Sequence, residues 1–214
     1  MHEGIFKVLF LREFEDTLMS SHECDRSPRK RILLGVTASV AAIKTQLLLN
    51  LLINNDYDVE VVATDASLYF FDQNKIPVRI HKTADEMCCW KTRGDPVLHI
   101  NLRNWADILL IAPLSANTLA KISNGIADNL LTCIARAWWW SNKQERKPAF
   151  FAPAMNTQMW EHPLTCEHID VLVHKLHWTQ IPPISKVLIC GEHGIGAMEE
   201  PENIVSTIKT FFLN

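Results

Sequence analysis

The sequence predicts an α/β fold of three layers, in which a doubly wound parallel sheet lies between two layers of helices. From residue 31 onward, short apolar segments of strand length alternate with longer segments in which apolar residues recur at helical spacing. This alternation is typical of a parallel sheet that helices cover on both faces. Residues 107–112 (DILLIA) form a continuous apolar run, as expected of a strand that is buried on both faces.

The strands are expected where mostly apolar residues stand together in short runs. They are residues 31–36, 58–63, 77–80, 107–112, 149–152 and 186–189.

The helices are expected where apolar residues cover one side of a longer segment. Ser39 is placed to cap the first of them, and Pro201 stands in the first turn of the last. The longest carries a weak point at Asn124-Gly125. The predicted helices are residues 39–54, 66–71, 115–138, 163–176 and 201–212.

Composition and charge argue against several classes of function. With 214 residues, 48% of them hydrophobic, the chain is long enough for one domain over 31–214. An extension over 1–30 precedes it, in which SSHECDRSPRKR has the polar composition of a linker or disordered tail. The net charge of −3 argues against a nucleic-acid binder. No apolar run approaches the roughly 20 residues of a membrane span.

The cysteines favour a reducing compartment. The chain has six of them, without CxxC spacing or a paired histidine pattern, so no zinc or other metal site is predicted. A chain of this size does not depend on disulfides for a core. The cytoplasm or the nucleus is therefore the expected location.

Hydroxyl side chains follow three of the predicted strands, each at the start of a helix. Ser39 follows the first strand, Thr64 and Ser67 follow the second, and Ser115 follows the DILLIA strand. Small residues at a helix N-terminus let a phosphate approach backbone N–H groups, although each loop by itself is an ordinary helix cap. Because the carboxyl ends of parallel strands meet at one crevice, a single mononucleotide explains this repetition better than three unrelated caps. The GxGxxG pattern of dinucleotide sites is absent.

Residues 153–160 (PAMNTQMW) follow the predicted strand 149–152 with an unusual mixture of side chains for a loop. Met155, Met159 and Trp160 avoid water, whereas the amide of Asn156 needs a partner if it is buried. Two interpretations stay open on these residues alone. The stretch is either a hydrophobic plug at the end of the core, or a clamp whose apolar walls and single amide orient a ligand.

Two further residues are candidates for chemistry. His99 stands among apolar neighbours (VLHI), where a hydrogen-bonded structural histidine is the more frequent finding, but an imidazole also transfers protons near neutral pH. Cys190 follows the predicted strand 186–189 and precedes a segment with three glycines (GEHGIG), which suits a mobile flap. The alternative for Cys190 is a buried strand cysteine.

Several motifs together resemble the flavin-containing cysteine decarboxylases. They are SVAAIK at 39–44, PLSANTLAKI at 113–122, DNLLTC at 128–133 and PAMNTQMW at 153–160. Two further segments resemble the branch of this family that acts on phosphopantothenoylcysteine in coenzyme A biosynthesis. These segments are DPVLHINLRNWAD at 95–107 and ICGEHGIGAMEEP at 189–201. Each motif is weak alone, but their order over residues 31–212 and their places at predicted strand ends are specific.

The resemblance implies a flavodoxin-like sheet, a bound FMN and a homotrimer with active sites between subunits. It implies catalytic roles for His99 and for Cys190, the latter as a proton donor on a flap. In the same way, Asn156 would recognise the substrate carboxylate, Met159 would form an apolar wall and Gly194 would contact the substrate. The implied FMN contacts are Ser39, Val40, Ala41, Thr64, Asp65, Ala66, Ser115, Ala116, Asn117, Thr118 and Ala154.

The chemistry that the resemblance implies is redox-neutral. The thiol of the substrate's cysteine end is oxidised to a thioaldehyde with FMN as acceptor, and carbon dioxide leaves to give an enethiol. Protonation by Cys190 and return of the hydride then yield 4′-phosphopantetheine. Two alternatives stay open: an enzyme that decarboxylates the C-terminal cysteine of a peptide, and a non-catalytic flavin-binding regulator of a phosphatase. The Cys190 flap argues against the first, and the lack of a long acidic tail argues against the second.

Two features depart from the family pattern. Ala38 stands where relatives commonly have glycine before the first serine, so an extra methyl group must fit beside the phosphate turn. The tryptophan-rich loop 138–147 (WWWSNKQERK) is longer than expected of the family. It is expected at the surface, with its outward tryptophans at a subunit contact.

Overall fold

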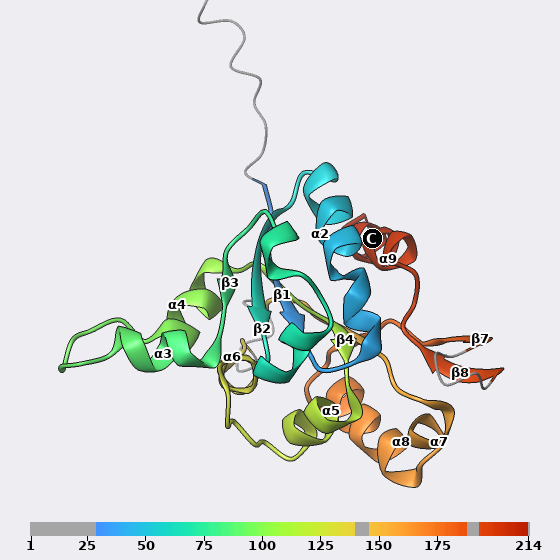
Figure 1. Ribbon diagram of the computed structural model, residues 1–214. Helices are drawn as coiled ribbons and strands as arrows, with labels where there is room; N and C mark the ends of the chain where they lie inside the picture. The colour runs from blue at the N-terminus through green and yellow to red at the C-terminus, as the bar shows by residue number, and fades with distance from the viewer. Residues whose placement is uncertain (1–28, 140–145, 188–192, 214) are drawn as a thin grey trace, which may run out of the picture.

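A computed structural model of the chain describes residues 29–139, 146–187 and 193–213, so the predicted extension 1–30 lies almost entirely outside it (Figure 1). In these ranges, six parallel strands form one sheet in the order β3-β2-β1-β4-β5-β6. The strands are β1 (Arg31–Val36), β2 (Asp58–Ala63), β3 (Ile80–His81), β4 (Ile108–Leu114), β5 (Ala149–Pro153) and β6 (Thr179–Gln180). Without the short edge strand β3, this is the flavodoxin-like strand order. The order in which strands are added to the sheet reverses between β1 and β4, which leaves a crevice at their carboxyl ends. The predicted doubly wound sheet is confirmed.

The predicted strands agree best with the structure at the centre of the sheet. Four of them, 31–36, 58–63, 107–112 and 149–152, fall on β1, β2, β4 and β5. The prediction of a strand over 77–80 is mostly wrong, because only Ile80 of that segment belongs to β3. Edge strands carry a weaker pattern, since one side of their backbone stays unpaired.

The prediction that places 186–189 among the parallel strands is also wrong for Lys186 and Val187, while residues 188–189 lie outside the described residues. β7 (Ile184–Val187) pairs with β8 (His193–Ala197) in an antiparallel hairpin outside the main sheet. In Figure 1 this hairpin extends from the side of the molecule. A parallel strand that is covered on both faces needs a continuous apolar run. The polar residues Ser185 and Lys186 interrupt such a run, so this segment forms the exposed hairpin instead.

Helices cover both faces of the sheet. The first predicted helix, 39–54, begins as a 3₁₀-helix, and the predicted helix 163–176 ends in a π-helical turn. The α-helices are α2 (Thr45–Asn54), α3 (Thr83–Cys89), α4 (Leu98–Trp105), α5 (Ala116–Ser123), α6 (Leu130–Ala137), α7 (Thr157–Trp160), α8 (Pro163–Asp170) and α9 (Pro201–Phe211). The other helical turns are η2 (Val40–Lys44), η3 (Asp65–Tyr69), η4 (Gln73–Lys75) and η5 (Val171–Lys175). No helix within the described ranges is long and apolar enough to cross a membrane.

The predicted helix 115–138 is two helices, α5 and α6, and the break follows the weak point named above. Gly125 has a φ of +74°, a conformation that glycine adopts without strain. Asn129 then starts α6, since its side chain accepts the N–H of Thr132 at 3.0 Å while the Thr132 hydroxyl accepts the N–H of Asn129 at 3.1 Å. Such a reciprocal cap starts a new helix rather than continuing an old one.

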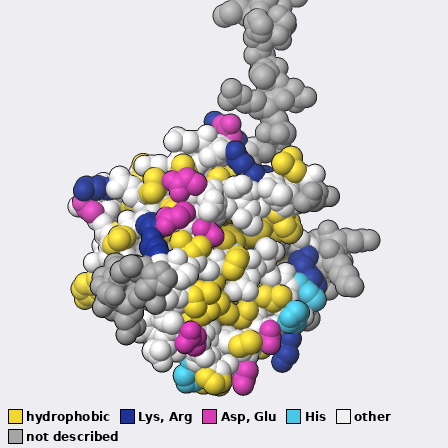
Figure 2. Space-filling view, turned by 90° about the vertical axis from the view of Figure 1, so that its right-hand side faces the viewer, with side chains coloured by type: hydrophobic (Ala, Val, Ile, Leu, Met, Phe, Trp, Pro, Cys, Tyr) yellow, Lys and Arg dark blue, Asp and Glu magenta, His cyan; other side chains and the backbone are white. Residues whose placement is uncertain are grey.

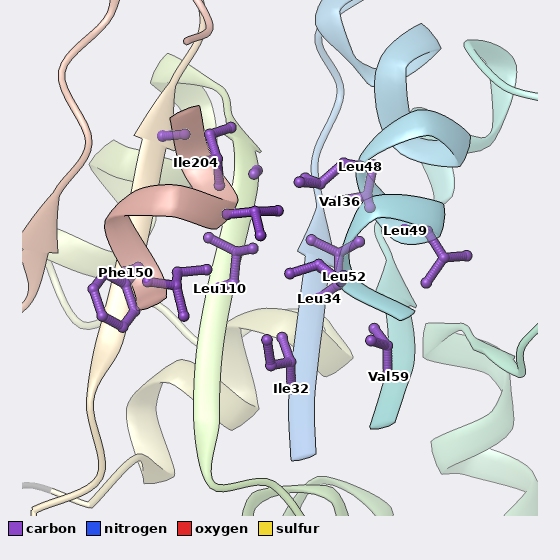
Figure 3. Close-up of a cluster of buried hydrophobic side chains, with 14 of the residues drawn as sticks. Ile32, Leu34, Val36, Leu48, Leu49, Leu52, Val59, Leu110, Phe150 and Ile204 are labelled. Carbon is purple, nitrogen blue, oxygen red and sulfur yellow. The ribbon is translucent and has the colours of Figure 1, made fainter. Parts of the chain in front are cut away.

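Alternate residues of the strands face two cores, one on each side of the sheet. Ile32 and Leu34 of β1 are fully buried toward α2 and α9, whereas Leu33 is buried on the opposite face. Figure 3 shows the first core, with Leu48 of α2 and Ile204 of α9 directed at the strands. Burial on both faces makes the sheet a rigid support for the loops at its carboxyl edge.

Trp138, the first of the three adjacent tryptophans, points inward. It is 6% exposed, packs in the second core with Trp178, and donates its indole N–H to the carbonyl of Lys147 at 3.0 Å. Residues 140–145 lie outside the described residues, so the expected subunit contact of this loop stays a prediction.

Arg31 and Asp107 join the amino ends of β1 and β4. The guanidinium donates from Nε and Nη2 to the two carboxylate oxygens at 3.1 and 3.0 Å, and the backbone N–H of Arg31 donates at 2.9 Å. Burial of Asp107 opposes its ionisation, but the hydrogen bonds from Arg31 outweigh this effect and hold the pKa of the carboxyl below its ordinary value.

We expect Asp107→Asn to lower the free energy of unfolding by about 1 kcal/mol near pH 7, a figure reduced because the pair is partly exposed. Since the pKa of Asp107 is lower in the folded chain, its contribution is complete above the unfolded value of about 3.9 and is lost as the pH falls through the folded value. Urea unfolding at neutral and acidic pH measures both effects. Asp170→Asn, at an exposed carboxylate, is the control. A difference between Asp107→Asn and the native chain that does not shrink in acid would contradict this account.

Candidate active site

A cavity of about 730 Å³ opens at the carboxyl ends of β1, β4 and β5, a volume typical of sites for small molecules. Residues 38–44 after β1, 115–117 after β4 and 154–159 after β5 supply most of its lining. Lys186 of β7 and the segment 196–198 close another side. The parallel sheet thus gathers loops that lie far apart in the sequence.

Most of the residues that were predicted to hold a ligand lie together in this cavity. Those that line it are Ser39, Val40, Ala41, Ser115, Ala116, Asn117, Ala154, Asn156 and Met159. Those that do not line it are Thr64, Asp65, Ala66, Thr118 and Gly194. The loop after β2 is represented instead by Phe70, which sequence reasoning missed.

The loop after β1 leads into a capped helical turn, as its small residues and Ser39 predict. The Ser39 hydroxyl accepts the N–H of Ala41 at 3.3 Å and so caps the 3₁₀-helix η2. Ala38 lines the cavity, and among the described non-glycine residues a positive φ is found at Asp56 and His177 but not at Ala38. Alanine in place of glycine therefore brings no backbone strain at position 38.

Thr37 connects the loops after β1 and β4. Its side chain is fully buried, and its hydroxyl donates to the carbonyl of Pro113 at 2.8 Å and accepts the N–H of Ser115 at 2.7 Å. Ser115 in turn caps α5, with its hydroxyl 3.4 Å from the N–H of Thr118. Thr118 therefore supports the loop from behind, while Ser115 faces the cavity.

The stretch after β5 folds as the short helix α7 at the edge of the cavity. The side-chain oxygen of Asn156 accepts the N–H of Met159 at 2.8 Å, which leaves the two amide N–H bonds of Asn156 as its available donors. Asn156 is exposed, Met159 is 50% exposed, and α7 contains no buried residue. These exposures argue against a hydrophobic plug formed by α7, and the clamp interpretation stays a prediction.

The hairpin contacts α7 through two glycines. A Cβ atom at Gly194 would lie 2.2 Å from the hydroxyl oxygen of Thr157, and one at Gly196 would lie 2.4 Å from the carbonyl oxygen of Met155. Gly196 also has a φ of +137°, and its carbonyl accepts the N–H of Met155 at 2.9 Å. Cys190 lies outside the described residues, between the two strands of this hairpin.

Two lysines give one side of the cavity a positive charge, a feature that the sequence did not reveal. Lys44 and Lys186 line the cavity and share the carboxylate of Glu200, with the Lys186 Nζ to Glu200 Oε1 distance at 3.0 Å. Lys44 first, and then Lys186, lower the pKa of Glu200. Two cations beside one anion leave a net charge that suits an anionic ligand.

His99 is not among the residues that line the cavity. It lies in the first turn of α4, where its Nδ1 contacts the carboxylate of Glu86 from α3. Figure 1 shows α3 and α4 on the opposite side of the molecule from α7 and the hairpin. Within the described ranges, no group of three His, Cys, Asp or Glu residues is placed to hold a metal ion.

Known proteins resemble this chain over most of its length. The family model described as Flavoprotein matches residues 19–213. A phosphopantothenoylcysteine decarboxylase of Mus musculus is 49% identical over 180 residues, which are 84% of this chain and 85% of the mouse protein.

Two solved structures are similar in both fold and sequence. A PPC decarboxylase mutant complexed with pantothenoylaminoethenethiol is 48% identical, with a TM-score of 0.81 over 87% of this chain and 100% of its own. The FMN binding protein AtHal3 is 49% identical, with a TM-score of 0.77 over 86% of this chain and 96% of its own.

The packing of the hairpin against α7 can be tested with Gly196→Ala. The added methyl group has no room beside Met155, so we expect the hairpin to detach and residues 184–197 to be cleaved at least several-fold faster by a nonspecific protease. Mass spectrometry of the fragments gives the site and the rate. Gly94→Ala is the matched control, because Gly94 also has a positive φ, +106°, but a methyl group added there would have nothing within 4 Å. Equal cleavage of the hairpin in both variants would show that the contact does not hold it.

Proposed function

This chain belongs to the Flavoprotein family, among its phosphopantothenoylcysteine decarboxylases, and we propose that it carries out the FMN-dependent decarboxylation of N-[(R)-4-phosphopantothenoyl]-L-cysteine to 4′-phosphopantetheine in coenzyme A biosynthesis. The observation that carries this proposal is the cavity at the carboxyl edge of the sheet. It unites the segments after β1, β4 and β5 with the clamp residues Asn156 and Met159.

The residues of the cavity fit FMN. Its volume of about 730 Å³ suits a nucleotide-sized ligand, and Ala38, Ala41 and Ala116 leave the backbone open to close approach. The hydroxyls of Ser39 and Ser115 and the start of α5 suit a phosphate. When bound, FMN supplies the reversible two-electron chemistry that makes the thiol end of the substrate an electron sink.

Asn156 is the residue that recognises the substrate carboxylate. Because its oxygen is occupied by the cap of α7, its amide N–H bonds are the donors that the exposed side chain can offer a ligand. A neutral donor is favourable here, since a cation would stabilise the carboxylate in the ground state and so oppose its loss as carbon dioxide. Met159 forms an adaptable apolar wall beside it.

A second copy of the chain completes the site. His99 lies away from the cavity of its own chain, so we assign it to the cavity of a neighbour in a homotrimer. Large hydrophobic side chains are exposed near both parts: Met87 (76%) and Trp90 (57%) follow Glu86, and Ile43 (56%) lines the cavity, with Leu47 (47%) four residues further along the chain. On the face that carries the hairpin, hydrophobic side chains gather in the middle with charged side chains around them (Figure 2). Such surfaces are typical of subunit contacts.

The free cysteines of the chain and the thiol of the substrate favour a reducing cellular compartment. The cysteines of the described ranges, Cys88, Cys89, Cys133 and Cys166, are free. Free thiols, together with a thiol substrate, are suited to a reducing compartment, and we assign the activity to the cytoplasm or the nucleus.

The experiment that tests the function follows carbon dioxide and the thiol product after FMN-loaded protein is mixed with 4′-phospho-N-pantothenoylcysteine. The native chain is expected to yield 4′-phosphopantetheine. Cys190→Ser is expected to release carbon dioxide but to accumulate the oxidised enethiol, because the proton donor is missing. Cys166→Ser, at an exposed cysteine of α8, is the control and is expected to behave as the native chain.

Other outcomes of this experiment would overturn the proposal. Normal product from Cys190→Ser would make Cys190 structural. Release of carbon dioxide from a peptide with a C-terminal cysteine, but not from the phosphorylated substrate, would indicate a peptidyl-cysteine decarboxylase. A preparation that binds FMN and releases no carbon dioxide from either substrate would favour the non-catalytic regulator.

A further inference from the structure

His99 has a specific partner in Glu86. The imidazole Nδ1 contacts Oε1 of Glu86, so the pair joins α3 to the first turn of α4. The side chains of His99 and Glu86 are 26% and 16% exposed, which keeps their contact partly away from water. A hydrogen bond to a carboxylate in such surroundings is stronger than one at the open surface.

Asp85, which precedes Glu86 on α3, has a different role. Asp85 accepts the backbone N–H of Lys82 at 2.8 Å and so satisfies the start of α3. Because Asp85 already serves this helix end, Glu86 is not needed for it. The helix turns the side chain of Glu86 toward α4 instead.

Charged and titratable groups of α6 and α4 have partners of their own. Burial raises the pKa of the Cys133 thiol, and the negative charges of Glu86 and Asp128 raise it further. Arg103 of α4 donates to the carbonyl of Ala137 at 3.2 Å, and its guanidinium faces Trp139 at 4.5 Å. Glu86 therefore contacts His99 directly, while its charge helps to keep the Cys133 thiol of α6 protonated.

A carboxylate at Nδ1 determines what the opposite nitrogen of the ring can do. It keeps the proton on Nδ1 and fixes the ring plane, so that Nε2 carries the lone pair and points away from Glu86. Partners of this kind commonly orient the histidines of metal sites and of catalytic triads.

We propose that Glu86 is a positioning residue, which holds the ring of His99 so that Nε2 faces the substrate in the cavity of the adjacent copy. This inference rests on the function proposed above. It adds to that function a residue that never touches the substrate and acts through His99.

The first test measures the tautomer of His99. In FMN-loaded protein labelled with ¹⁵N-histidine, the ring nitrogen shifts report which nitrogen carries the proton, and the His99 signals are those missing from His99→Asn. We expect the Nδ1–H tautomer in the native chain and in Glu86→Gln, whose amide oxygen still accepts. Glu86→Ala is expected to give a mixture of tautomers. An unchanged His99 signal in Glu86→Ala would overturn the proposal.

The second test asks whether Glu86 acts through His99. Glu86→Ala is expected to keep FMN but to release carbon dioxide about 10- to 100-fold more slowly. When His99→Asn is already present, the same substitution is expected to have no further effect, because its target is gone. A further loss of similar size in the double variant would contradict positioning through His99.

The chain offers a matched control in a second Glu–His contact. Glu60 Oε2 lies 2.5 Å from Nε2 of His81, between β2 and β3. Glu60→Gln is expected to change neither the His99 tautomer nor the rate. Since the NMR measurement needs no turnover, it decides whether Glu86 orients His99 even if the native chain leaves phosphopantothenoylcysteine unchanged, in which case the function proposed above fails separately.

Discussion

The parallel pairing of β1, β4 and β5 is the constraint on which the site depends. These strands run side by side in one direction, so the loops that follow them emerge at one edge of the sheet. The buried hydroxyl of Thr37 then links two of these loops through its bonds to Pro113 and Ser115. The cavity is therefore formed by the backbone and the packing of this edge of the sheet.

The cavity and the histidine are separate parts of one chain. The cavity carries Asn156, the hairpin and the lysine pair around Glu200, whereas His99 and Glu86 lie away from it, with α3 and α4 on the opposite side of the molecule from α7 and the hairpin in Figure 1. Exposed hydrophobic side chains border both parts. If His99 transfers protons in the cavity of a neighbouring copy, as we propose, assembly becomes a condition for catalysis.

The sequence predicts the centre of this protein better than its margins. The strands that are buried on both faces have strong local patterns, so β1, β2, β4 and β5 and the cavity loops after β1 and β4 were predictable. The hydroxyl pattern after β2 was misleading, because Thr64, Asp65 and Ala66 do not line the cavity. The hairpin of β7 and β8 was not predictable, because no local pattern indicates that Ile184 pairs with Ala197 or that Gly194 and Gly196 pack against residues 155–157. The same is true of Lys44, Lys186 and Glu200, and of Glu86 with His99, whose partners no local pattern reveals.

The central claim is that the cavity of one chain works with the histidine of another, and co-expression of two inactive variants tests it most directly. His99→Asn lacks the histidine. Asn156→Asp keeps an oxygen to cap α7 but replaces the amide donor with a negative charge. In mixed rings about a quarter of the sites combine an intact cavity with an intact neighbouring histidine, so the pair is expected to recover about a quarter of the native rate of carbon dioxide release. No recovery in assembled mixtures of the two inactive variants would contradict the shared site.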